Sequence, residues 1–157
     1  VPAQAFGIKL VAGNLPEILR WSKIIQDRVN EDIGFRHPEK PEICGVSQVH
    51  WYSPPVERED VDARSVNVFL PGVDRSPCGT GTSARAVTLF VQGKLGLGEE
   101  FSQESLTGGK FTAKIKQSVS VGGYPGAVPT LTGAAHITGF HKFVVDSEDS
   151  LAFGFPF

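Results

Sequence analysis

A lone cysteine stands between a proline and two glycines in the segment DRSPCGTGTSA, residues 74–84. The apolar run after it predicts a helix over residues 80–92, so Cys78 would lie at the N-terminal end of that helix. Unpaired backbone N–H groups and the helix dipole favour negative charge there, and such a position lowers the pKa of a thiol below about 8.5. The segment therefore indicates either an ionisable cysteine or a small apolar residue that fills a tight corner.

The residues around Cys78 are suited to binding a small anion. Gly79 and Gly81 let the backbone approach a ligand closely, and N–H groups that stabilise a thiolate can also hold a carboxylate. A competing pattern is present, because residues 79–84 (GTGTSA) match the dinucleotide fingerprint and Glu99 follows at roughly the expected distance of about 20 residues. We reject a dinucleotide site, because Glu99 precedes the next expected strand instead of ending it.

The other segments predict an α+β domain in which a curved, mixed but mostly antiparallel sheet wraps around the helix that begins near residue 80. We expect a first strand over 5–11, an amphipathic helix of about 15 residues after Asn14 as N-cap, and an exposed connection over 36–42. The helix over 80–92 is apolar on nearly every side, which predicts that it is buried. Further strands are expected over 45–52, 63–70, 100–106, 110–117, 127–131 and 134–145.

Length and composition restrict the class of protein. A chain of 157 residues with 40% hydrophobic residues can form one domain, here residues 1–157, with a core of its own. The net charge of -2 gives no basic surface for nucleic acid, and the apolar runs are too short to span a bilayer. The two cysteines and four scattered histidines show no metal-ligand spacing. We therefore expect a cytoplasmic protein without a metal, a nucleic-acid partner or a membrane partner.

Residues 74–82, DRSPCGTGT, resemble the signature of the second catalytic cysteine in the proline racemase and hydroxyproline epimerase family. Similar segments include RHPE at 36–39, GEEF at 98–101 and GAAHITG at 133–139. Members of this family have two similar halves, each a sheet wrapped around a helix as in diaminopimelate epimerase, and this chain resembles only the second half. The resemblance implies that an N-terminal half is absent, as expected for a chain that begins at Val1 and has no methionine. It also implies a homodimer.

The resemblance further implies roles for individual residues. Cys78 would be the acid or base on one face of the substrate Cα, Asp74 would pair with the ring ammonium, and the N–H groups of Gly79 and Thr80 would hold the carboxylate. Phe69 corresponds to an aromatic residue that packs on the pyrrolidine ring. The implied activity is racemisation or epimerisation of proline or 4-hydroxyproline without any cofactor, and its second cysteine would come from the absent half.

Two other functions stay open. Related enzymes dehydrate 3-hydroxyproline by removing the same α-proton, although one such group has threonine in place of Cys78. A chain without the second base is also compatible with a non-catalytic module that binds a small carboxylate. Cys44 does not match the family's other base, and we expect a partly buried thiol that iodoacetate labels more slowly than Cys78. We expect structural roles for His50, His136 and His141.

Overall fold

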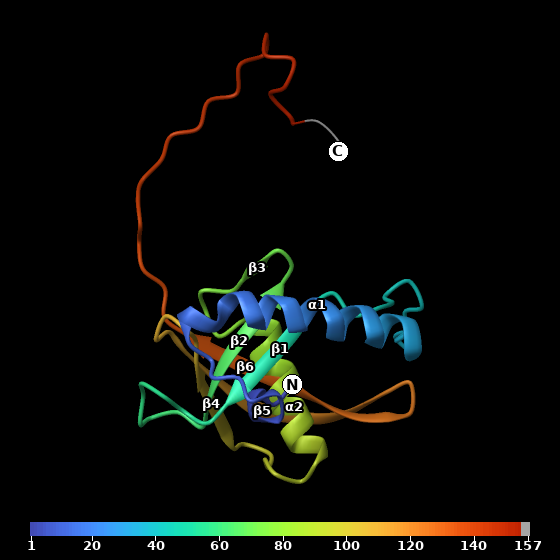
Figure 1. Cartoon of the computed structure of the whole chain (residues 1–157). Coiled ribbons are helices and arrows are strands. Elements are labelled where there is room, and N and C mark those ends of the chain that lie inside the picture. Colours follow the sequence, from blue (N-terminus) through green and yellow to red (C-terminus); the bar gives the residue numbers. More distant parts are fainter. Residues whose placement is uncertain (155–157) are drawn as a thin grey trace.

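The computed structural model describes residues 1–154, so the last three residues of the predicted domain lie outside the described residues. Its elements are η1 Ala3–Phe6, η2 Ala12–Asn14, α1 Leu15–Asp32, β1 Val49–Ser53, β2 Ala63–Phe69, β3 Gly72–Val73, α2 Gly79–Val91, β4 Glu100–Glu104, β5 Lys110–Val121 and β6 Tyr124–Gly133. The strands form one sheet in the order β1-β2-β4-β5-β6, with β3 paired to β2 (Figure 1). Among the named strands of the described residues, β2 with β4 is the one parallel pair, so the predicted α+β class with a mixed, mostly antiparallel sheet is confirmed.

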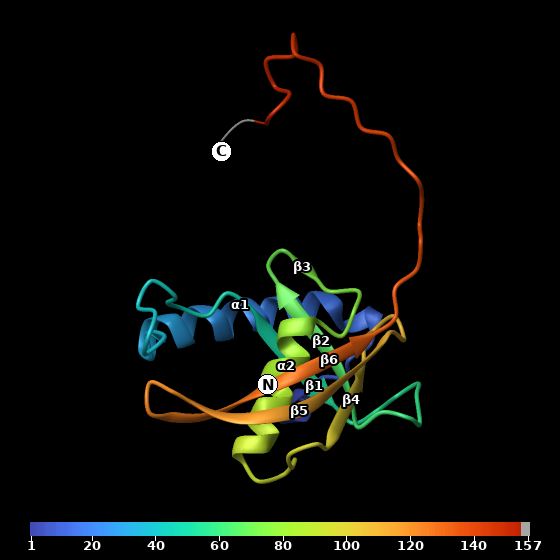
Figure 2. The same cartoon turned by 180° about the vertical axis from the view of Figure 1, so that it is seen from behind.

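Helix α2 lies inside the curve of the sheet, with β1 and β2 on one side and the β5–β6 hairpin on the other (Figure 2). Ala86 of this helix is fully buried and belongs to one apolar cluster with Ile115 of β5. The helix expected to be buried is buried only on the sides that face the sheet, because the sheet is open and does not close around it. One stripe of α2 at helical spacing is exposed: Thr80, Ala84, Thr88 and Val91.

Helix α1 covers the opposite face of β1 and β2 (Figure 1). As predicted, it begins directly after Asn14 and turns an apolar stripe inward, with Ile18 fully buried. Asn14 makes no side-chain capping bond; its amide instead donates to the carbonyl of Lys9 at 3.0 Å. The buried indole N–H of Trp51 donates to Ser22 Oγ at 2.7 Å, which satisfies the one polar group of that large side chain.

The strand expected over residues 5–11 is absent. The chain forms the short 3-10 helix η1 there and then turns at Gly7, whose φ of 66° is a left-handed conformation that favours glycine. Ile8 and Leu10 are nevertheless buried in the same core as α1, as their apolar spacing suggested. The apolar residues of this segment are therefore buried without forming a strand, because no described strand pairs with residues 5–11.

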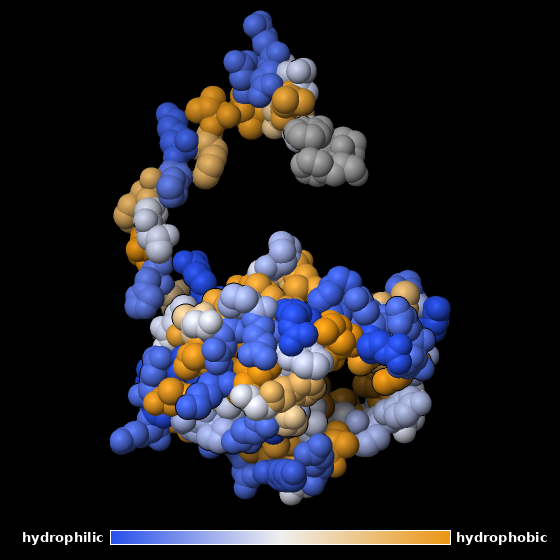
Figure 3. Space-filling view, viewed as in Figure 1, coloured by the Kyte–Doolittle hydropathy of each residue, from blue (hydrophilic) through white to orange (hydrophobic). Residues whose placement is uncertain are grey.

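The segment after Gly133 leaves the body of the molecule and extends away from it in both views (Figures 1 and 2). The strand expected over 134–145 is wrong for the described residues, because this segment lies along no other strand and a strand needs a hydrogen-bonded neighbour. Its apolar side chains are uncovered, and Phe140 and Phe143 are 93% and 90% exposed (Figure 3). No described helix is long and apolar enough to cross a membrane.

Strand β2 has one edge on which β4 and β3 lie one after the other. Its first residues pair with Gln103 and Glu104 of β4, and its last residues pair with β3. The N–H of Asp74, just after β3, extends this pairing by donating to the carbonyl of Asn67 at 3.0 Å. The turn over 74–78 therefore passes between β3, β4 and the start of α2, which places it at the meeting point of three elements.

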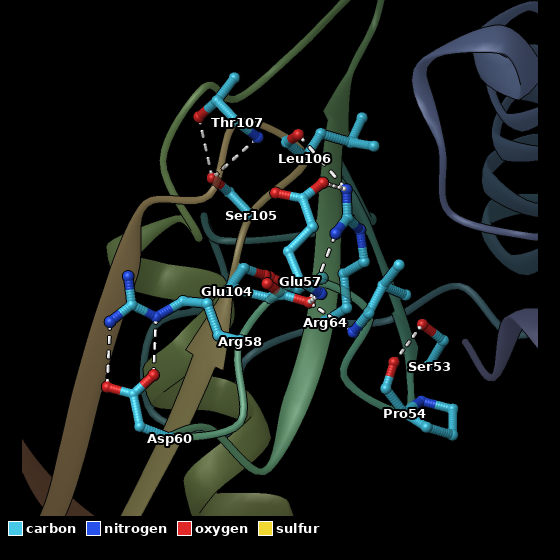
Figure 4. Close-up of polar contacts among 12 residues, drawn as sticks. Ser53, Pro54, Glu57, Arg58, Asp60, Arg64, Glu104, Ser105, Leu106 and Thr107 are labelled. Atoms are coloured by element: carbon cyan, nitrogen blue, oxygen red, sulfur yellow. Dashed lines mark hydrogen bonds and ion pairs between the residues drawn. The ribbon is translucent and has the colours of Figure 1, made fainter.

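A buried ion pair joins β2 to β4 (Figure 4). Arg64 Nη1 lies 3.3 Å from Glu104 Oε1, and the two side chains are 2% and 0% exposed. The same carboxylate oxygen accepts the N–H groups of Val56 and Glu57 at 2.7 and 3.1 Å, and Arg64 Nη2 reaches Glu57 Oε1 at 3.0 Å. The pair thus attaches the loop over 54–62 to the edge of the sheet.

Candidate active site

Cys78 is the N-cap residue of α2, as the sequence predicted. Its side chain is nearly buried, with the residue 7% exposed, and Sγ accepts the N–H of Gly81 at 3.4 Å. Its φ of 67° and ψ of 122° form a backbone conformation that costs a residue with a Cβ about 1–3 kcal/mol. Contacts in the surrounding structure must offset this energy. The position of the sulfur is therefore fixed by those contacts and not by the intrinsic backbone preference of Cys78.

Burial raises the pKa of the Cys78 thiol above its ordinary value. The side chain of Asp74 raises it further, whereas the N–H groups of Gly81 and Thr80 lower it. The expectation that the helix N-terminus makes this thiol easier to ionise is therefore wrong for this chain, although the N–H groups act in the expected direction. The thiol is protonated at neutral pH.

The two cysteines should react with iodoacetate in the reverse of the order expected from the sequence. Cys44 is exposed, whereas Cys78 is buried with a raised pKa, and only an accessible thiolate is alkylated rapidly. At neutral pH we expect Cys44 to be labelled first, as followed by mass spectrometry of the tryptic peptides over 37–58 and 76–85. Urea should bring the two rates together, and faster labelling of Cys78 in the folded chain would contradict this prediction.

Asp74 lies close enough to Cys78 for its carboxylate to act on the thiol. Its Oδ2 accepts the amide N–H of Asn67 at 3.3 Å, and Asn67 also donates to Gln48 Oε1 at 2.9 Å. Asn67 thereby fixes the carboxylate from the neighbouring strand β2. The sequence alternation placed Asn67 in a strand but gave no signal for this role.

Gly79 and Thr80 open α2, where the first N–H groups of a helix have no partner within it. Both residues therefore present donors next to Cys78, as expected. Gly81 serves a different purpose from close approach to a ligand, because a Cβ at this position would overlap the ring of His50. Burial lowers the pKa of His50 to about 4, so its ring is neutral at pH 7 and packs against α2, in agreement with a structural role.

Phe69 ends β2 and is 43% exposed. Its ring packs against Gly72 across the turn to β3. Residues two apart in a strand share a face, so Phe69 is on the side of β2 that carries Asn67. The structure thus offers an accessible aromatic ring on the same face as the partner of Asp74.

The remaining candidates lie elsewhere. His136 and His141 are exposed and lie in the segment after β6. Helix α2 does connect two parallel strands, β2 and β4, as dinucleotide-binding units do. However, β3 intervenes before the helix, and Glu99 lies ahead of β4 with its carboxylate accepting the N–H of Gly96 at 2.6 Å. The rejection of a dinucleotide site therefore still rests on the position of Glu99.

The fold and the site define a class of α+β unit in which an open, curled sheet holds one helix whose N-terminus is capped by a cysteine next to an aspartate. The sequence profile described as "Proline racemase" matches residues 1–156. The chain belongs to the proline racemase family. The resemblance noted in the sequence is thus confirmed over nearly the whole chain.

Individual relatives agree with this assignment. The chain is 39% identical over 156 residues to a proline racemase of Acetoanaerobium sticklandii and 41% identical over 156 residues to a trans-3-hydroxy-L-proline dehydratase of Bacillus cereus, covering 99% of this chain and 46% of each relative. A hydroxyproline epimerase of Agrobacterium vitis, solved with bound trans-4-hydroxy-L-proline, superposes with a TM-score of 0.81 at 32% identity, over 100% of this chain and 45% of that one. The chain spans less than half the length of the relatives that it matches.

Proposed function

We propose that this chain is the second of two halves of an amino-acid racemase or epimerase that inverts proline or 4-hydroxyproline at Cα. The observation that carries the proposal is the pairing of Cys78, capping α2, with Asp74 in the adjacent turn. A thiol, a carboxylate and free helix N–H groups are the donors and acceptors that an imino acid needs. The names of the relatives support the same substrate class.

The proposed reaction exchanges one proton for another at Cα. A base of the first half removes the proton from one face, and the electron pair left on Cα spreads into the substrate carboxylate. The N–H groups of Gly79 and Thr80 stabilise that growing charge, and Asp74 holds the ring ammonium. Cys78 then donates its S–H proton to the opposite face and becomes a thiolate, which accepts the N–H of Gly81.

The raised pKa of Cys78 supports this donor role. A thiol that stays protonated at neutral pH can deliver a proton, whereas a thiolate can only accept one. The reverse reaction uses Cys78 as the base, and the N–H groups of Gly81 and Thr80, which lower the pKa of the thiol, favour the thiolate that this step requires. Phe69 would cover the ring of the substrate. No cofactor takes part in these steps.

A dehydratase is the second candidate, favoured by the Bacillus cereus relative. It would remove the same α-proton from 3-hydroxyproline and expel the 3-hydroxyl group as water, so the substrate loses a C–O bond instead of regaining a C–H bond. The same residues of this chain could serve both reactions, because both begin with loss of the α-proton. The presence of Cys78 argues only against the group of dehydratases with threonine at this position.

Incubation in deuterated water tests these alternatives. The full-length protein is given L-proline, trans-4-hydroxy-L-proline or trans-3-hydroxy-L-proline, and the products are examined by NMR and chiral chromatography. We expect deuterium at Cα together with inversion of proline or 4-hydroxyproline, without added cofactor. A cyclic imine from 3-hydroxyproline would support the dehydratase, and absence of exchange with all three would leave a non-catalytic carboxylate-binding module.

The two-half organisation can be tested separately by intact-mass analysis of the active protein. We propose a polypeptide about twice the size of this 16.9 kDa chain, because the relatives are about twice as long. An active species of 16.9 kDa would overturn the need for a first half. Size-exclusion chromatography with light scattering of the same sample would test the implied homodimer.

A further inference from the structure

Gln103 on β4 connects the core of the sheet to the turn that carries Cys78. It is fully buried, and its Nε2 lies 3.2 Å from the carbonyl oxygen of Pro77 and 2.8 Å from Oγ1 of Thr82. Thr82, also fully buried, lies on the first turn of α2 with Oγ1 2.6 Å from the carbonyl oxygen of Cys78. One side chain of the sheet thus reaches both carbonyl groups that flank the Cα of Cys78, one directly and one through a hydroxyl group.

The direction of each hydrogen bond in this chain of contacts is fixed. A backbone carbonyl can only accept, so the amide nitrogen of Gln103 must face Pro77. The hydroxyl group of Thr82 lies 2.6 Å from the carbonyl oxygen of Cys78 and 3.2 Å from that of Pro77, and both can only accept, so Thr82 donates its single proton to a carbonyl and accepts from Gln103. Reversing the amide of Gln103 would place its Oε1 against the carbonyl oxygen of Pro77, and two acceptors cannot form a hydrogen bond. The amide nitrogen of Gln103 is therefore the donor to both Pro77 and Thr82.

These contacts act on the two peptide planes that determine the conformation of Cys78. The carbonyl of Pro77 belongs to the plane before its Cα, and the carbonyl of Cys78 belongs to the plane after it. Holding both planes holds φ and ψ, here at the positive φ of 67° that the residue would not adopt by itself. The second plane also contains the N–H of Gly79, so its direction is fixed by the same bond.

We propose that Gln103 is a positioning residue, which through Thr82 keeps the sulfur of Cys78 directed at the N–H of Gly81 and keeps the N–H of Gly79 directed at the substrate carboxylate. Its consequence for activity rests on the proposed function. Its consequence for the thiol does not, and can be measured in this chain alone. Mere filling of the core would require only the volume of Gln103, whereas positioning requires its N–H groups.

The first test measures how the alkylation rate of Cys78 depends on pH, followed in the tryptic peptide over 76–85. Gln103→Leu and Thr82→Val keep the volume but break the contacts. We expect both to move the midpoint of alkylation to higher pH, because the sulfur loses the N–H of Gly81. Thr82→Ser keeps the hydroxyl group and should restore the wild-type midpoint. Gln117→Leu, the same substitution at an exposed position of β5, is the matched control.

The titratable groups that face this turn do not obscure the measurement. Asp74 is present unchanged in every variant, and His50, whose Nε2 lies 3.4 Å from Gln103 Nε2, is neutral in the pH range of thiol titration because burial lowers its pKa to about 4. A midpoint that stays unchanged or moves to lower pH in Gln103→Leu and Thr82→Val would overturn the proposal. Should Gln103→Leu fail to fold by circular dichroism, the pair Thr82→Val and Thr82→Ser decides the question.

The second test uses the full-length enzyme. We expect kcat for α-proton exchange to fall about tenfold in Gln103→Leu and in Thr82→Val, the effect of one lost hydrogen bond in the transition state, and to recover in Thr82→Ser. The double variant should be no slower than the slower single variant, because both residues act in one chain of contacts. Unchanged kcat would overturn the role in catalysis. Absence of exchange in the wild type, with the alkylation shift intact, would instead overturn the proposed function alone.

Discussion

Replacing Cys78 with serine in the full-length protein lowers the rate of inversion of its imino-acid substrate by about 10²–10⁴-fold, the contribution expected of one acid–base group. A serine hydroxyl group is far less acidic than a thiol, so it can neither deliver a proton to Cα nor take one from it at neutral pH. Deuterium incorporation should be lost for at least one enantiomer, because each cysteine of the proposed pair serves one face. Chiral chromatography and NMR of the same reaction measure both effects.

Cys44→Ser is the matched control for this substitution. Cys44 is exposed and lies in a loop, bridged to Arg36, so its replacement should leave both rates unchanged. Inversion at the wild-type rate in Cys78→Ser would contradict the proposed role, and loss of activity in Cys44→Ser would show that the assignment of the two cysteines is reversed.

Replacing Glu104 with alanine lowers the free energy of unfolding by about 3–5 kcal/mol, the usual cost of leaving one partner of a buried ion pair without the other. Arg64 is 2% exposed and would keep only Glu57, whose side chain is 53% exposed, as an acidic partner. The N–H groups of Val56 and Glu57 would also lose their acceptor. Because small proteins are stable by about 5–15 kcal/mol, urea unfolding of this chain should show a much lower midpoint.

Two further variants separate the ion pair from the general effect of removing an acid from β4. Glu100→Ala removes an exposed carboxylate from the same strand, 3.8 Å from Lys114, and should cost no more than about 1 kcal/mol. Arg64→Met combined with Glu104→Leu removes both charges and should recover most of the lost stability. Equal destabilisation by Glu100→Ala and Glu104→Ala would contradict the explanation.

The sequence predicted the helices and strands that can be recognised from the apolar spacing within a single segment. Helix α1 follows from the apolar spacing after Asn14, and the strand expected over 63–70 is β2, which ends one residue earlier at Phe69. The errors fall where structure depends on a partner. The segment over 5–11 has the apolar spacing of a strand but no neighbour to pair with, and the same holds for 134–145. The local spacing of apolar residues does not predict which distant segments will form hydrogen bonds with each other.

The candidate site divides in the same way. The apolar run after the motif predicted that Cys78 would lie at the N-terminal end of a helix, and the structure confirms this. The roles of Cys78 and Asp74 toward a substrate stay predictions. Burial of the thiol was one of the two readings that the sequence left open, whereas its positive φ was not predictable, because the turn is held by contacts with the distant strand β4. Gln103 carries no sequence signal of its own, since its part in the site depends on register between β2 and β4.

The parallel contact between β2 and β4 consists of only two residue pairs, yet the two proposed ends of the substrate site are attached to opposite sides of it. Asn67 on β2 holds the carboxylate of Asp74, whereas Gln103 on β4 holds the turn with the sulfur. A shift in register between β2 and β4 would change the distance between Asp74 and Cys78 without a substitution at either residue. The relative position of these two side chains therefore depends on strand register in the sheet, remote from the proposed reacting atoms.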